Sequence, residues 1–133
     1  PWRMLDAPEG GTLEQGQAPD ARPALRIQAG PVTAASWRAR VYLERGRYRF
    51  EGAARLAGVA PLPFGRNQGA GLRVAGHRQA RPYQFIGDSP WRTLTVDFEV
   101  TEPVEAVDLV CELRARQGVV WFDLESLRVV RRP

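Results

Sequence analysis

The sequence predicts an all-β protein whose antiparallel sheets pack face to face. Three observations carry this prediction. Apolar and polar residues alternate with a period of two over much of the chain, glycine and proline interrupt the alternating runs, and no run shows a clear helical period. Each alternating strand buries one face, so a sandwich of two sheets is the simplest way to cover every apolar face. We expect seven or eight strands.

The two runs on either side of Gly46 show the alternation most clearly. Residues 36–45 (SWRARVYLER) and residues 47–56 (RYRFEGAARL) each place apolar side chains on one face and mainly charged ones on the other. Because Gly46 is a turn residue between them, we expect the two runs to pair as antiparallel strands. The residues expected to point inward are Trp37, Ala39, Val41, Leu43, Tyr48, Phe50, Ala54 and Leu56.

The remaining segments follow the same pattern with longer interruptions. Residues 57–71 and 78–90 are rich in glycine, proline or polar residues and predict irregular connections. Further strands are expected at 24–30, 72–77, 91–100, 106–116 and 119–130, with a short strand within 1–5 and a turn-rich connection over 6–23.

Length and composition limit the classes of protein to which this chain can belong. A chain of 133 residues predicts one domain, 1–133, which we expect to be cut from a longer protein. All 19 basic residues are arginine, but they are scattered among 15 acidic residues, so no nucleic acid is expected as a partner. No apolar run is long enough for membrane insertion. The single Cys111 cannot form an internal disulfide and leaves the redox compartment open.

Three spaced features carry a family resemblance over residues 24–131. Gly46 leads into a strand bearing Tyr48, Trp91 opens a strand that ends in Phe98-x-Val100, and Asp123 follows an aromatic residue in the last strand. This order resembles the galactose-binding-domain-like β-sandwich, especially the carbohydrate-binding modules of families 4, 9 and 22. The resemblance implies a jelly roll that works as a noncatalytic module of a larger extracellular or cell-envelope protein, with a polysaccharide or other glycan as ligand.

The resemblance also implies a structural calcium ion. In that family the last-strand aspartate often helps to bind calcium, and Asp123 matches its position. Calcium needs six to eight oxygen ligands, and Asp6, Glu9 and Glu14 are only weak substitutes for the family's N-terminal acid. The alternative is that Asp123 makes local hydrogen bonds to the backbone.

Aromatic residues beside polar ones are the candidate sugar contacts. A sugar stacks its apolar face on Trp or Tyr while its hydroxyls bind Arg, Asp, Glu, Asn or Gln. The candidate carbohydrate-binding residues are Tyr42, Arg40, Arg49, Tyr83 and Trp121. Tyr83 and Phe64 could instead be loop anchors. Trp121 becomes the best candidate if Phe122 and Leu124 point inward, because Trp121 is then partly exposed.

No residue pattern predicts an enzyme. His77 is the only histidine and has no partner at catalytic spacing. The outward carboxylates Asp97, Glu99, Asp108 and Glu112 are expected to form cross-strand pairs with arginine. Two functions therefore remain: the carbohydrate-binding module, and an architectural or protein–protein interaction domain that contacts a protein partner or other domains of its parent protein.

Overall fold

The computed structural model describes residues 2–5, 11–79 and 81–133 of the chain. The described residues form nine strands and one 3-10 turn, η1 (Leu124–Ser126). The strands are β1 (Arg3–Leu5), β2 (Thr12–Gln17), β3 (Pro23–Gln28), β4 (Thr33–Ala60), β5 (Gln68–Val74), β6 (Gln84–Phe85), β7 (Gly87–Ala115), β8 (Gln117–Asp123) and β9 (Arg128–Arg132). None of the described residues forms a helix long and apolar enough to span a membrane.

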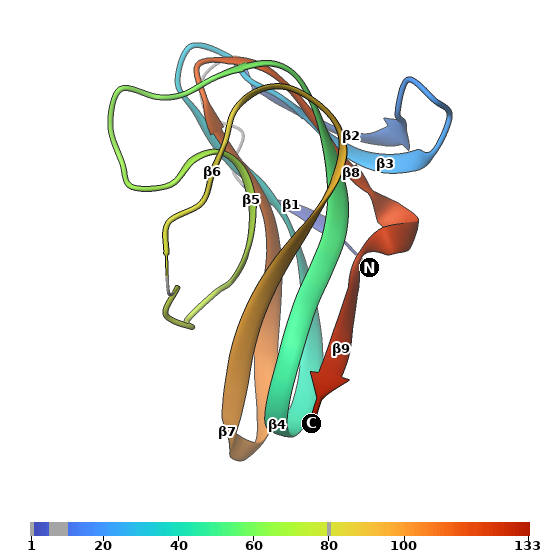
Figure 1. Cartoon of the computed structure of the whole chain (residues 1–133), viewed down its shortest axis with the longest axis vertical. Helices are drawn as coiled ribbons and strands as arrows, with labels where there is room; N and C mark the ends of the chain where they lie inside the picture. The colour runs from blue at the N-terminus through green and yellow to red at the C-terminus, as the bar shows by residue number, and fades with distance from the viewer. Residues whose placement is uncertain (1, 6–10, 80) are drawn as a thin grey trace.

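One long ribbon of two strands, β4 and β7, organises the fold. The two strands pair antiparallel from Thr33↔Ala115 to Val59↔Gly87, with a register shift between Glu44 and Gly46. At this shift both strands bend at the lower end of the molecule and turn back upward (Figure 1). The ribbon therefore folds over on itself, and its two halves belong to different layers of the sandwich.

The expected pairing of residues 36–45 with residues 47–56 is wrong. Both segments belong to β4, and each pairs with β7 instead of with the other. The alternation continues through the bend because the register shift absorbs the change of direction without ending the strand. A glycine between two alternating runs is compatible with a hairpin and with such a bend, so the local pattern could not separate them.

The remaining strands extend the two halves of the ribbon. Layer 1 contains the second half of β4, the first half of β7, and β2, β3, β8 and β9; layer 2 contains the first half of β4, the second half of β7, and β1, β5 and β6. The pairings are antiparallel except for the short parallel contact of β5 with β6. The predicted all-β sandwich is confirmed.

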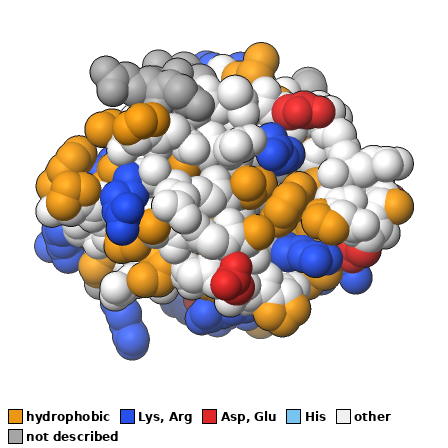
Figure 2. All heavy atoms as spheres, turned by 90° about the horizontal axis from the view of Figure 1, so that it is seen from above, with side chains coloured by type: hydrophobic (Ala, Val, Ile, Leu, Met, Phe, Trp, Pro, Cys, Tyr) orange, Lys and Arg blue, Asp and Glu red, His pale blue; other side chains and the backbone are white. Residues whose placement is uncertain are grey.

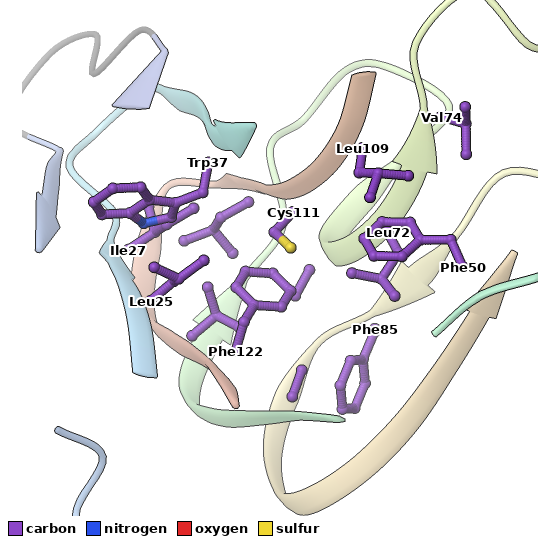
Figure 3. Packing of buried hydrophobic residues seen from close by; sticks show 14 of the residues in the cluster. Leu25, Ile27, Trp37, Phe50, Leu72, Val74, Phe85, Leu109, Cys111 and Phe122 are labelled. Atoms are coloured by element: carbon purple, nitrogen blue, oxygen red, sulfur yellow. The ribbon is translucent and has the colours of Figure 1, made fainter. Parts of the chain in front are cut away.

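The core lies between the two layers, and every second residue along a strand points into it. Phe50 and Phe122 of layer 1 are fully buried and point toward Leu72 and Leu109 of layer 2 (Figure 3). Trp37 Nε1 of layer 2 donates a hydrogen bond of 3.2 Å to the carbonyl of Arg26 in layer 1. The inward residues expected around Gly46 all lie in this cluster or against it, except Ala39, which is also buried.

Strand β2 was expected as part of a turn-rich connection. It pairs along its whole length with β3 at the edge of layer 1, and Leu13 is its residue packed against the core. An edge strand with so little burial needs almost no apolar residues, so its sequence TLEQGQ carries no alternating signal.

Candidate functional site

A hollow beside Trp121 lies on the outer face of layer 1. Trp121 precedes Phe122 on β8, and because Phe122 is buried, Trp121 points away from the core and is half-buried. Its cross-strand neighbours are Arg26 on β3 and Arg55 on β4. The hollow measures about 540 Å³ and is lined by Pro19, Arg55, Leu56, Ala57, Asp88, Ser89, Pro90 and Trp121. We call it the Trp121 hollow.

The turn between β2 and β3 forms one wall of the Trp121 hollow. Asp20 Oδ2 accepts a hydrogen bond of 2.7 Å from Trp91 Nε1, and this bond is the main reason that the pKa of Asp20 lies below 3.8. The Arg22 guanidinium lies 4.9 Å from the centre of the Trp91 ring. Trp91 is therefore occupied by contacts within the protein, and Trp121 is the tryptophan that lines the hollow.

The polar groups of the Trp121 hollow include both donors and acceptors. Arg55 supplies a guanidinium, which only donates hydrogen bonds. Asp88 accepts a bond of 2.7 Å from the backbone N–H of Gly58 through Oδ1, and no described residue donates to its Oδ2. The backbone bond holds the Asp88 carboxylate in place while one oxygen stays available, an arrangement that suits vicinal hydroxyl groups next to a stacked ring.

Tyr42 and Arg40 lie on the outer face of layer 2. Tyr42 is 72% exposed. Arg40 donates to both oxygens of Asp108, at 2.9 and 3.2 Å. The structure thus brings Arg40 and Tyr42 together on one strand face, but the Arg40 guanidinium is already bound to a carboxylate.

Arg49 lies on the outer face of layer 1, far along the sheet from Trp121. It donates to both oxygens of Asp97, at 2.8 and 3.2 Å, and Asp97 also pairs with Arg132. Its position is six residues from Arg55 on β4, which corresponds to roughly 20 Å along a strand. Arg49 and Trp121 therefore do not belong to one site.

Tyr83 is bound into the structure. Its ring lies on Gly71 so closely that a side-chain carbon at Gly71 would overlap it. Its hydroxyl donates a hydrogen bond of 2.9 Å to Glu112, which also accepts a bond of 2.6 Å from Arg73. Burial, with a smaller effect of the Glu112 charge, raises the pKa of Tyr83 far above 10.0. These contacts are those of a loop anchor.

His77 is also held by contacts within the protein. Its Nε2 shares a hydrogen bond with Glu105, and its ring packs edge-on against Phe98 with 5.4 Å between ring centres. The contacts join the end of β5 to the ribbon, so they explain the histidine structurally without a catalytic role.

Asp123 makes local hydrogen bonds, as expected in the alternative to calcium binding. Its Oδ1 accepts a bond of 3.2 Å from the backbone N–H of Glu125 and caps η1, and its Oδ2 lies 3.4 Å from Arg22 Nη1. An amide and a guanidinium are donors, whereas calcium requires oxygen ligands. No three His, Cys, Asp or Glu side chains among the described residues could hold a metal. Asp6 and Glu9 lie outside the described residues, and calcium stays a prediction.

The arginine–carboxylate pairs give the protein an expected acid sensitivity. Hydrogen bonds from Arg49 and Arg40 hold the pKa values of Asp97 and Asp108 below 3.8. A carboxylate with a lowered folded pKa stabilises the protein above its unfolded pKa, and this contribution disappears as the pH falls through the folded pKa.

We therefore expect the free energy of unfolding to fall as the pH drops from about 5 to about 2. Urea denaturation across this range should show a weaker pH dependence in Asp97→Asn and Asp108→Asn than in the unchanged protein. Parallel pH profiles for all three proteins would contradict the role assigned to the two pairs.

The comparisons with known proteins bear on the fold. At the level of sequence, no protein-family model and no curated protein matches the chain. The structure of TmCBM61 in complex with β-1,4-galactotriose matches it with a TM-score of 0.64 at 14% identity, covering 99% of this chain and 89% of that chain. A structure described as "CBM4 structure and function" matches with a TM-score of 0.60 at 16% identity, covering 98% and 86%. The chain has the β-sandwich fold of carbohydrate-binding modules.

Proposed function

We propose that the protein is a noncatalytic carbohydrate-binding module of a larger secreted or cell-envelope protein. The observation that carries this proposal is the Trp121 hollow, in which an indole ring, a guanidinium and a held carboxylate line one depression. A sugar ring stacked on Trp121 would place its hydroxyls against Arg55 and Asp88. The balance of donor and acceptor favours a neutral sugar. The shared fold supports the proposal without fixing the ligand.

A second function is favoured by the outer sheet faces. Arginine–carboxylate pairs occupy much of both faces, including Arg40–Asp108, Arg49–Asp97, Arg73–Glu112 and Arg128–Glu51. Side chains engaged with each other in this way leave few groups for a glycan. They suit an architectural or protein-interaction domain that contacts other parts of its parent protein.

Affinity electrophoresis against soluble galactans, β-glucans and xylans tests the proposal. We expect at least one neutral polysaccharide to retard the protein. Trp121→Ala should weaken this binding by roughly 30-fold or more, because a central stacked aromatic residue contributes about 2 kcal/mol or more. Tyr42→Ala should leave it unchanged.

The Tyr42→Ala variant is the matched control, since it removes an exposed aromatic ring from the other layer. Loss of retardation with Tyr42→Ala alone would move the site to layer 2. Free migration through every gel would overturn the carbohydrate proposal for that panel and favour the architectural function. A chelator added to parallel gels and thermal melts tests the calcium prediction.

A further inference from the structure

One long stretch of the chain contains no acidic residue. Between Glu51 and Asp88 the sequence contains five arginines and no Asp or Glu. Arg73 of this stretch pairs with Glu112, whereas Arg66, Arg78 and Arg81 form no ion pair with any described residue. This stretch is therefore locally basic, although arginines are scattered among acidic residues over the chain as a whole.

The connections before and after β5 bring two of these arginines to one hollow. It measures about 230 Å³ and is lined by Arg66, Asn67, Arg78, Gln79 and Pro82. Two hydrogen bonds hold Asn67 in this lining: its Oδ1 accepts from the Tyr83 N–H at 3.1 Å, and its Nδ2 donates to Gln79 at 3.0 Å. The two guanidiniums are the charged groups of the lining, so the hollow is suited to an anion. We call it the Arg66 hollow.

The Arg66 hollow is one end of a groove that is formed by three adjoining hollows. It shares Gln79 and Pro82 with a second hollow of about 360 Å³. The second shares Leu72, Tyr83 and Thr95 with a third of about 290 Å³. Arg81 lines the second and Arg92 the third, where the Arg92 guanidinium lies 4.8 Å from the centre of the Phe85 ring. Arginines thus occur along the whole groove.

The surroundings contain little negative charge to neutralise these arginines. Asp97, the carboxylate of the second hollow, is already shared by Arg49 and Arg132. Arg114 Nε donates to the Asn67 carbonyl at 3.1 Å and forms no ion pair with the described residues. Figure 2 views the molecule from the end opposite the bend, where basic, acidic and apolar side chains are interspersed.

We propose that this groove binds an acidic polysaccharide, with the carboxylate of a uronic acid residue held between Arg66 and Arg78. An arginine fork matches a planar carboxylate with two parallel hydrogen bonds. Thr95 and Gln79 add polar groups that suit neighbouring sugar hydroxyls. The site is separate from the Trp121 hollow and does not depend on it.

A single-stranded nucleic acid fits the groove less well. Such ligands need aromatic rings on which bases stack. Of the aromatic residues that line the groove, Tyr83 is fixed on Gly71 and Phe85 is buried beneath Arg92. The lining offers guanidiniums and hydroxyls without an open ring, which favours an acidic sugar chain.

Isothermal titration with oligogalacturonate at low ionic strength tests the inference. We expect binding that weakens with added salt, since the attraction is between exposed charges. Arg66→Gln/Arg78→Gln should weaken it at least tenfold. The matched control is Arg47→Gln/Arg128→Gln, which removes the same net charge from exposed positions near the bend and on β9 and should retain the affinity.

Trp121→Ala should also leave oligogalacturonate binding unchanged, so failure of this inference is distinguishable from failure of the neutral-sugar site. Four results would overturn the inference: no binding, equal losses in the two double variants, preference for dextran sulfate with no uronate binding, or tighter binding of oligo-dT that depends on Arg66 and Arg78. The last result would identify a nucleic-acid surface instead. Melting curves of each variant confirm that it is folded.

Discussion

Phe122→Ala should lower the free energy of unfolding by about 3–5 kcal/mol. Phe122 is fully buried in the centre of layer 1, where its cross-strand neighbours are Leu25 and Ala54. Removing the ring loses the favourable free energy of its transfer from water into the core. It also leaves a cavity that the close-packed sheets cannot fill completely. Urea denaturation measures the loss as a lower midpoint with little change of slope.

Trp121→Ala and Phe64→Ala are the controls for this prediction. Trp121 is adjacent in sequence but lies on the outer face, so its loss should cost roughly 1 kcal/mol or less. Phe64 is 55% exposed and its replacement should stay within about 0.5 kcal/mol. A larger cost for Trp121→Ala than for Phe122→Ala would mean that β8 is shifted by one residue, because such a shift exchanges its two faces.

The alternating pattern predicted which strand faces are buried, but it could not predict which strands pair. The side chains predicted to point inward in segments 36–45 and 47–56 are the ones that do so, because alternation depends only on the local pleat of the strand. The pairing of these segments was wrong because both have a better partner more than 30 residues away, in β7. That choice depends on contacts far apart in sequence, which a local pattern does not contain.

The candidate site was predictable only in part, for the same reason. The sequence singled out Trp121 by its place in a strand, and the structure puts it on the outer face beside a hollow. The wall residues Pro19, Arg55 and Asp88 come from three distant segments, and no spacing connects them to Trp121. Arg40 and Arg49 were chosen as outward arginines, which alternation predicts, but alternation does not show that each already binds a carboxylate.

Gly118→Ala should destabilise the protein by several kcal/mol. Gly118 has a φ of +105°, which an L-residue adopts at a cost of about 1–2 kcal/mol. An added Cβ would also lie 2.5 Å from the Gly58 carbonyl oxygen and from Val59 Cα, which are backbone atoms of β4. Since backbone atoms cannot rotate away, β8 or β4 must move.

Such a movement would disturb the contacts of β8 with both β4 and β3. The Gly118 carbonyl accepts a hydrogen bond of 2.8 Å from Ala29 N–H, so the start of β8 is fixed between β4 and the end of β3. Gly76→Ala is the matched control, because Gly76 has a φ of +81° and no atom within 4 Å of the added carbon. We expect Gly76→Ala to cost only the backbone penalty of about 1–2 kcal/mol. Equal thermal shifts in the two variants would show that the close approach of β8 to β4 does not contribute, whereas a much larger shift for Gly118→Ala would confirm it.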